Sequence, residues 1–274
     1  MSKIAWTGTT WNPIVGCSKV SAGCRNCYAE RMAFRLAHMG QANYQQVVDS
    51  AGWNGRVATC SARHWDNVPK SGLCFVCSMG DLFYEAVPCR YLDEVYSEML
   101  SHPNTTFQVL TKRPQRALHY YESSIDNSGA YEGLLSRIGN APNIWLGATC
   151  ENQEWADRRL KVLYEIDPVL RFASLEPLLG RIDLKFHLGL APNHEDLQGL
   201  LGWLIVGCES GSGRRPCKLQ WVRAIVDQCG AAGVPVFVKQ IEIDGRVVHD
   251  VEPIAKALGY TVAEIRQFPA GVVA

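Results

Sequence analysis

The feature that most limits the possible folds of this chain is a repeated alternation of short apolar runs with helix-length segments. The runs are rich in β-branched and aromatic residues, and the segments between them carry apolar residues at helical spacing. Such alternation is typical of a parallel sheet that is covered by helices on its outer face. The expected strands are 14–16, 73–78, 106–111, 144–149, 170–174, 203–207 and 234–239. The expected helices are 25–39, 90–101, 152–166 and 219–232.

We therefore expect an α/β fold, a partial (βα)6-type barrel of about six or seven parallel strands. The chain has 274 residues, which is enough for one large core, and we expect a single domain over 1–274. Two stretches fit the alternation poorly, and we interpret them as insertions near 41–72 and 183–201. The C-terminal tail, 241–274, also departs from the pattern.

Charge and composition restrict the partners that this protein can attract. Lys plus Arg and Asp plus Glu both number 27, so no global field favours nucleic acid or an anionic membrane, and any such partner needs a local patch. No apolar run approaches the roughly 20 residues that span a bilayer, and the N-terminus lacks a signal-peptide core, so we expect a cytoplasmic protein without membrane contact. The 11 cysteines are odd in number, which favours metal binding over a disulfide framework.

Polar residues follow the expected strands in series. In α/β barrels the carboxyl ends of the strands form the active-site face, so an enzyme would concentrate polar side chains there. Three carboxylates, Glu151, Glu176 and Glu209, follow strand runs directly and would be costly unless each met a ligand or a cation. Each polar residue taken alone has a simpler role as the cap of the next helix, and this alternative applies to Asp81, Asn152 and Ser210.

A loop with three cysteines precedes the first expected helix. Cys17, Cys24 and Cys27 have the spacing C-x6-C-x2-C, and clustered thiolates bind zinc or an iron–sulfur cluster. A structural zinc site needs four protein ligands. The nearest downstream pair, Cys74 and Cys77, lies in an expected strand at an odd separation, so the two side chains should point to opposite faces and serve as core thiols. A cubane cluster with an open iron fits three ligands, and structural zinc remains the alternative.

These motifs resemble those of a known superfamily. The loop GC-x6-GCRNCYAE is similar to the cluster loop of radical S-adenosylmethionine (SAM) enzymes, although the usual spacing there is C-x3-C-x2-C. More specifically, the chain resembles a phage-associated three-Cys-motif family of unknown function, some members of which act in thymidine hypermodification. The motifs that carry this resemblance are WTGTTWNPIVGC, GCRNCYAERMA, SMGDLF, LTKRP, LGATCENQEWADRR, RFASLEPLLG, IVGCESG and AAGVPVFVKQ.

The resemblance implies a radical SAM-like barrel with a [4Fe–4S] cluster on Cys17, Cys24 and Cys27, which delivers an electron to SAM. The motif after the second strand would hold the SAM amine, and the Asp81 carboxylate could meet its ammonium. The residues expected to contact the cofactor are Ser78, Gly80, Asp81, Thr111, Thr149, Glu151, Asn152 and Ser174. Those expected to be catalytic are Lys112 and Glu176, together with Cys150 and Cys208 as hydrogen donors; the alternative for the two thiols is a buried packing role.

The resemblance also suggests a substrate and partners. We expect an isomerase that rearranges an amino-acid-modified thymine, glycyl-thymidine, in DNA or as a nucleotide. It would receive electrons from a donor such as flavodoxin or ferredoxin, in the host cytoplasm if the protein is phage-encoded. The alternatives are a radical SAM base lyase or repair enzyme and a non-catalytic Zn or Fe–S nucleic-acid-binding module. Cations expected to grip DNA are Lys112, Arg113, Arg158, Arg159, Arg214 and Arg215, and Arg214 and Arg215 have the alternative of pairing with Glu209.

Overall fold

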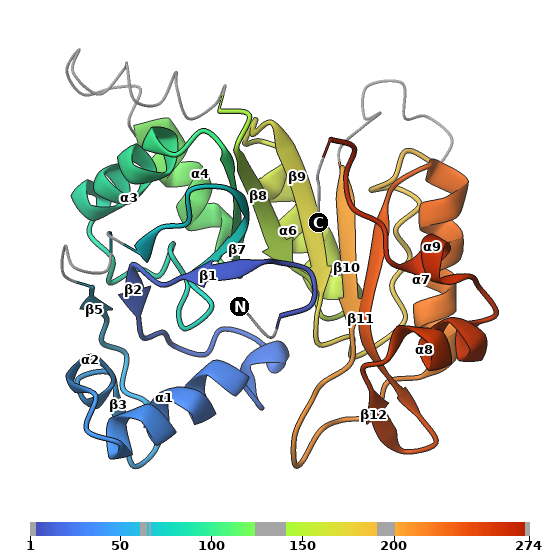
Figure 1. Cartoon of the computed structure of the whole chain (residues 1–274), viewed down its shortest axis with the longest axis horizontal. Coiled ribbons are helices and arrows are strands. Elements are labelled where there is room, and N and C mark those ends of the chain that lie inside the picture. The colour runs from blue at the N-terminus through green and yellow to red at the C-terminus, as the bar shows by residue number, and fades with distance from the viewer. Residues whose placement is uncertain (1–3, 61–64, 66, 124–140, 191–200, 272–274) are drawn as a thin grey trace.

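A curled sheet of eight strands organises the molecule and forms a half-barrel (Figure 1). The computed structural model describes residues 4–60, 65, 67–123, 141–190 and 201–271. The strand order is β1-β6-β7-β8-β9-β10-β11-β12, and every neighbouring pair is parallel except β11 and β12. The α/β class and the seven parallel strands therefore confirm the coarse expectation. The sheet comprises β1 (Thr9–Trp11), β6 (Gly72–Val76), β7 (Thr105–Thr111), β8 (Ile144–Thr149), β9 (Leu170–Leu175), β10 (Trp203–Gly207), β11 (Val236–Ile243) and β12 (Arg246–Val248).

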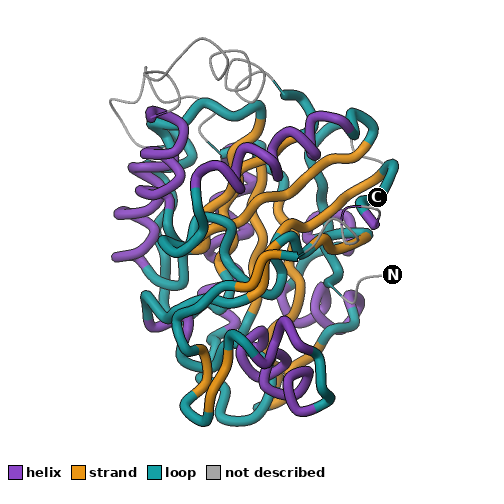
Figure 2. Tube along the Cα trace, turned by 90° about the vertical axis from the view of Figure 1, so that its left-hand side faces the viewer, coloured by secondary structure: helices purple, strands orange, loops and turns teal. Residues whose placement is uncertain are grey.

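Helices between successive strands cover one face of this sheet. Figure 2 shows the strands side by side through the molecule with helices around them. Their apolar stripes pack on the sheet in one core that contains, for example, Leu92, Leu160 and Ile225. The helices are α1 (Tyr28–His38), α3 (Cys89–Ser101), α4 (Pro114–Ser123), α6 (Gln153–Leu163), α7 (Leu219–Ala232), α8 (Val251–Leu258) and α9 (Val262–Ile265). No helix among the described residues is both long and apolar enough to cross a membrane.

The concave face of the sheet is filled by aromatic rings. Alternate residues of a strand share a face, and Phe75, Trp145, Phe172, Trp203 and Phe237 form a second core that no covering helix enters. Gly147 leaves the space for one of these rings, because a Cβ at this position would lie 2.6 Å from the ring of Phe172. The half-barrel is therefore a packed core over most of its depth.

The first strand expected for the parallel sheet, 14–16, does not belong to that sheet. The sheet begins with β1, whereas 14–15 form β2 (Ile14–Val15), which pairs antiparallel with β5 (Ala58–Thr59) outside the main sheet. The region expected to be an insertion contains α2 (Ala42–Gln45) and a hairpin of β3 (Val48–Asp49) and β4 (Gly52–Trp53). In Figure 1 these small elements lie together with α1 at the lower left. Residues 185–189 form turns, and 191–200 lie outside the described residues.

The C-terminal tail extends the sheet. β11 runs on to Ile243, four residues beyond the expected strand end, and turns back through β12 as an antiparallel hairpin. Helices α8 and α9 then pack beside β11, and α8 ends at Leu258 and is capped by Gly259, whose φ of 79° suits glycine. The tail therefore covers the edge of β11 that would otherwise be an open sheet edge.

Candidate functional site

The three cysteines of the C-x6-C-x2-C motif lie on one loop between β2 and α1. Cys17, Cys24 and Cys27 are free thiols of intermediate exposure. The loop begins at Gly16, whose φ is 105° and where a Cβ would lie 2.3 Å from the carbonyl oxygen of Arg56, so the turn requires glycine. A short 3-10 helix, η1 (Ala22–Cys24), leads into the second cysteine. We call residues 16–27 the thiol loop.

Arg113, just after β7, forms the first anchor of the thiol loop. Its Nη1 lies 3.5 Å from the Cys17 sulfur, and its Nη2 donates to the carbonyl and hydroxyl oxygens of Ser18, at 3.0 and 2.9 Å. The guanidinium is itself held by Asp81, at 3.2 Å, and by Glu85, at 2.9 Å. Arg113 is almost fully buried, so this contact is fixed by charge and by packing.

Glu151, just after β8, forms the second anchor. Its carboxylate accepts a hydrogen bond from the Gly23 amide at 3.0 Å and pairs with Arg159 at 2.8 Å. The Glu151 side chain is 0% exposed and that of Arg159 is 3% exposed. Burial alone would raise the pKa of Glu151, but Arg159 and the hydrogen bonds from the thiol loop hold it below its ordinary value. The carboxylate is therefore charged and shared between the loop and the arginine.

Glu209, which follows β10, forms the third anchor. It accepts a hydrogen bond from the Asn26 amide at 2.9 Å, and Asn26 also donates to the Gly213 carbonyl oxygen at 2.8 Å. Arg215 pairs with the same carboxylate at 2.6 Å. Arg113, Glu151 and Glu209 thus fasten the thiol loop to the carboxyl ends of three different strands. We call these residues the three anchors.

A second group of polar residues lies at the carboxyl end of the concave face, above the aromatic core. Within their strands Thr149, Ser174 and Lys239 follow an aromatic residue of that core by two or four positions, so they share its face, while Lys112 and Glu176 lie just after β7 and β9. Thr149 and Ser174 are directly paired across β8 and β9. Glu176 reaches Lys239 on β11, with Oε1 3.1 Å from Nζ. We call these five residues the inner polar group.

Glycine at position 207 makes the Glu176–Lys239 contact possible. β10 lies between β9 and β11 in the sheet, so the Glu176 side chain must cross it to reach Lys239. A Cβ on Gly207 would lie 2.4 Å from the Glu176 carboxylate oxygen. The missing side chain therefore leaves a passage for one ion pair across three strands.

Several residues that we expected to contact a cofactor instead hold protein groups. Asp81 does not begin a helix, since α3 begins at Cys89; its carboxylate accepts from Thr111 Oγ1 at 2.7 Å, the Lys112 amide at 3.0 Å and Arg113. A ligand ammonium would have to compete with Arg113 for this carboxylate. Asn152 caps α6 by accepting from the Trp155 amide at 3.0 Å, as its alternative role predicts.

The segment that contains Ser78 and Gly80 lies against the thiol loop. Ser78 donates to the Asn12 side chain at 3.1 Å, and its carbonyl oxygen accepts from the Tyr28 hydroxyl at 2.6 Å. Gly80 forms a β-bridge with Gly16, and a Cβ on Gly80 would lie 3.0 Å from the Gly16 carbonyl oxygen. The close approach that we expected at Gly80 therefore occurs with the thiol loop.

Cys150 and Cys208 do not face the concave side. Both are buried in the core between the sheet and its covering helices, so the expectation that their thiols lie where a substrate reacts is not met. The alternative packing role fits their position. Burial raises the pKa of each thiol to about 12, which keeps both protonated at neutral pH.

This burial gives a direct chemical prediction. Alkylation of the native protein with iodoacetamide at pH 8 should leave Cys150 and Cys208 unmodified and should modify the exposed Cys89, because the thiolate is the reactive form and the buried sulfurs have no access to reagent. Peptide mass spectrometry measures the extent at each site, and the same reaction in denaturant is the control that should modify all three. Equal labelling of Cys150 and Cys89 in the native protein would contradict the placement.

Cys74 and Cys77 are core thiols, as expected, but only Cys74 lies in the strand. β6 ends at Val76, and Cys77 lies just beyond it with a φ of 62°. Both side chains are buried in the core with the covering helices. Neither thiol therefore completes a four-ligand zinc site on the thiol loop.

The cations expected to grip DNA are mostly engaged within the protein. Arg159 is buried against Glu151, and Arg113 is buried against Asp81, so these two cannot contribute to a surface rim. Arg215 pairs with Glu209, as its alternative predicts. The remaining three are Lys112, Arg158, which pairs with Glu154 on the surface, and Arg214, which donates to the Gly245 carbonyl.

The donor chemistry of the thiol loop fits a thiolate-bound metal group, since its three thiols are free, partly exposed and carried by one anchored segment. Burial and Asp81 raise the pKa of Cys17 to about 12, and Arg113 opposes them, so a metal would have to displace this proton on binding. Within the described residues, no three His, Cys, Asp or Glu side chains already have the spacing of a metal site. The thiol side chains would therefore have to turn toward a bound group.

Comparison with family models shows the family of this chain. A family model described as "Protein of unknown function (DUF5131)" matches residues 1–258. This match includes the thiol loop, the three anchors and the inner polar group. No curated protein and no solved structure matches the chain.

Proposed function

The chain belongs to the DUF5131 family, and we propose that it is a radical SAM enzyme. The observation that carries this proposal is the thiol loop, whose three free cysteines are fastened by three anchors across the carboxyl end of a parallel half-barrel. This end of an α/β barrel is where active sites lie. The spacing of the cysteines and the motifs around them resemble radical SAM proteins, which adds support from the sequence.

In this proposal each group of residues has a separate task. Cys17, Cys24 and Cys27 would hold a [4Fe–4S] cluster, which would supply the electron for reductive cleavage of SAM. The inner polar group would contact SAM and the substrate, because it lies on the concave face at the same end of the sheet. The aromatic core below would exclude water from the reacting atoms.

Arg113 has a positioning role in this scheme. Its Nη1 donor already points at the Cys17 sulfur from 3.5 Å, and a hydrogen bond to a ligating thiolate tunes the potential of the metal group that it holds. Asp81 and Glu85 fix the guanidinium in place. We therefore assign Asp81 to the support of Arg113 in addition to any contact with SAM.

The experiment that tests the enzyme class is anaerobic reconstitution with iron and sulfide, followed by addition of SAM and dithionite. Liquid chromatography with mass spectrometry should detect 5′-deoxyadenosine in proportion to the cluster content. The Cys89→Ala variant is the matched control, because this thiol is exposed and lies outside the loop. Tight zinc binding with no 5′-deoxyadenosine would instead indicate a binding module.

For the substrate we propose an amino-acid-modified thymine, glycyl-thymidine in DNA or as a nucleotide, which the enzyme would isomerise with electrons from a flavodoxin or ferredoxin. An isomerisation conserves all atoms, so the product should have the mass of the substrate and a different retention time. A loss of mass would indicate a lyase or repair reaction. Comparing a modified oligonucleotide with the modified nucleotide distinguishes the polymer from the free form.

A further inference from the structure

Exposed large apolar side chains are concentrated in the segment that runs from the thiol loop through α1. Among the described residues nine such side chains are exposed, and five of them lie within 20–39: Val20, Tyr28, Met32, Phe34 and Met39. A single exposed apolar side chain is ordinary, whereas several close together mark an interaction surface. This segment is therefore a candidate for contact with another molecule.

Three of these side chains and one arginine form a stripe along α1. Tyr28, Met32, Arg35 and Met39 follow one another at intervals of four, three and four residues, so they lie on one side of the helix. Met32 is 42% exposed and Met39 is 66% exposed, and Arg35 is exposed as well. We call these four residues the α1 stripe.

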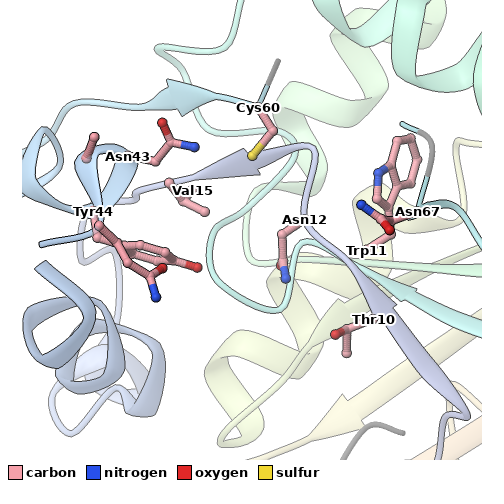
Figure 3. Close-up of a pocket in the computed structure, with 10 residues that line it drawn as sticks. Thr10, Trp11, Asn12, Val15, Asn43, Tyr44, Cys60 and Asn67 are labelled. Atoms are coloured by element: carbon pink, nitrogen blue, oxygen red, sulfur yellow. The ribbon is translucent and has the colours of Figure 1, made fainter. Parts of the chain in front are cut away.

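The opposite side of α1 attaches the helix to the rest of the protein. Ala29 and Ala33 are buried in a small core with Val15, and Tyr44 packs against this core. Figure 3 shows Val15 and Tyr44, which come from β2 and α2 and also line a pocket. The helix is therefore held by its alanine side, and no hydrophobic core of the described residues includes a member of the α1 stripe.

The segment that carries the α1 stripe is positively charged, although the whole chain is neutral. Residues 16–39 contain four Lys and Arg residues and one Glu. This acid, Glu30, pairs with Lys19 at 2.8 Å, and its side chain is only 13% exposed. The neighbouring segment 42–59 contains one acidic and one basic residue, which cancel. Three cations of the segment are exposed: Arg25, Arg31 and Arg35.

The α1 stripe is continuous with the thiol loop. It begins at Tyr28, the residue after Cys27, and the Tyr28 hydroxyl donates to the Ser78 carbonyl oxygen at 2.6 Å. Arg31, beside the stripe, donates to the Ser210 carbonyl oxygen at 3.1 Å, which ties α1 to the segment that follows the third anchor. A partner that covers the stripe would therefore contact the chain next to the last of the three thiols.

An apolar stripe bordered by cations fits an acidic protein better than it fits other partners. Met and Arg are enriched in protein interfaces, and complementary charge speeds association. A second copy of this chain would bring the same cations to the same surface, and their repulsion opposes self-association. A nucleic-acid backbone would meet the cations but would leave Met32 and Met39 in water.

We propose that the α1 stripe and the cations beside it form the docking surface for an acidic electron-carrier protein of the flavodoxin type. The inference rests on the proposed function for its need of an electron donor, whereas the surface is defined without any metal. One electron leaves the reduced flavin of the carrier and enters the metal group of the thiol loop, and no bond forms or breaks. Electron-transfer complexes bury less than about 1,200 Å², which suits a surface made by one helix and the adjoining loop.

The first experiment measures binding of an acidic flavodoxin to the protein as isolated, by isothermal titration calorimetry. Arg35→Glu should weaken binding roughly tenfold, because it replaces an attraction by a repulsion. Met32→Ala should weaken binding roughly three- to tenfold, because the partner then buries less apolar surface. Lys161→Glu is the matched control and should bind as the parent does, since Lys161 is likewise an exposed cation in the last turn of its helix, α6.

The salt dependence of the same binding tests the charge argument. Raising the salt concentration from about 50 to 300 mM should weaken flavodoxin binding by the parent, because exposed charges are screened. The dependence should be smaller for Arg35→Glu, which contributes one attractive charge fewer. An equal salt dependence of the parent and this variant would show that Arg35 does not face the partner.

The second experiment compares two reductants on the reconstituted enzyme. Dithionite needs no docking, so 5′-deoxyadenosine formation with dithionite should be equal in the parent, Arg35→Glu and Met32→Ala. With reduced flavodoxin at a concentration below its Kd, Arg35→Glu should form the product roughly tenfold more slowly than the parent does, in proportion to the weaker binding. Lys161→Glu should match the parent with both reductants.

The outcomes separate this surface from the proposed function. Flavodoxin binding that is unchanged in both stripe variants would overturn the docking surface, even if dithionite supports SAM cleavage. A lack of 5′-deoxyadenosine with dithionite would overturn the radical SAM proposal, and flavodoxin binding alone would then decide the surface. Variants that lose affinity for single-stranded DNA and keep their affinity for flavodoxin would assign the stripe to a nucleic acid and overturn the proposal.

Discussion

Single replacement of Cys17, Cys24 or Cys27 by Ala should remove iron binding and abolish 5′-deoxyadenosine formation, while the fold is retained. A cubane cluster on three protein ligands has no spare thiolate in the loop, so each loss is expected to be complete. The fold should persist because the loop is held by Arg113 and Glu151, and Glu209 also contacts it. Iron content per chain, product mass spectrometry and thermal unfolding by circular dichroism measure the three properties.

The controls for this prediction are cysteines outside the loop. Cys89→Ala should change nothing, since this thiol is exposed. Cys74→Ala should leave iron content unchanged and lower the free energy of unfolding by about 1 kcal/mol, as expected when a small buried group is truncated. Unfolding of every thiol-loop variant together with loss of zinc would instead show that the metal has a structural role.

Glu151→Gln should cause a large loss of stability, about 3–5 kcal/mol in the free energy of unfolding at pH 7. Glu151 and Arg159 are both buried, and removing one charge leaves the other without its partner. Urea unfolding measures the change. Glu154→Gln on α6, the helix that carries Arg159, is the matched control, because Glu154 pairs with Arg158 on the surface and such pairs contribute about 0–1 kcal/mol. Equal effects of the two substitutions would contradict the buried pair.

The same pair predicts a dependence on pH. The pKa of Glu151 is lowered in the folded protein, so its stabilising effect is fully present above the ordinary carboxyl pKa of about 4.3 and is lost as the pH falls through the folded value. The stability difference between the parent and Glu151→Gln should therefore be constant near neutrality and shrink below about pH 4. A difference that grows on acidification would contradict this assignment.

The sheet was largely predictable from the sequence, because buried parallel strands are continuous apolar runs. β8 and β10 coincide with the expected ranges, and α7 begins and ends where its stripe and Gly233 predict. β1 could not be found in this way, since Thr9–Trp11 contains one apolar residue and gains its place only by pairing with β6. The apolar residues at 14–15 suggested a sheet strand, but they lie between Pro13 and Gly16.

The sequence was enough to predict which kinds of partner the carboxylates of the candidate site need, but not which residues the carboxylates contact. The sequence indicated that Glu151, Glu176 and Glu209 each needs a cation or a ligand, and the cations are Arg159, Lys239 and Arg215. Nothing local to the three carboxylates showed that two of them also hold the thiol loop, because Gly23 and Asn26 are more than a hundred residues away in sequence. Likewise, the sequence could not show that Arg113 contacts Cys17, because this contact depends on where β7 lies relative to the thiol loop.

The anchors also give a geometric meaning to the long spacer between the first two cysteines. Ser18 is tied to Arg113 after β7, and Gly23 is tied to Glu151 after β8, so both ends of the spacer are fixed to neighbouring strands. The intervening residues span the distance between these two contacts. A chain with a shorter spacer would have to give up one of these two contacts, so spacer length and anchor pattern in this fold must change together.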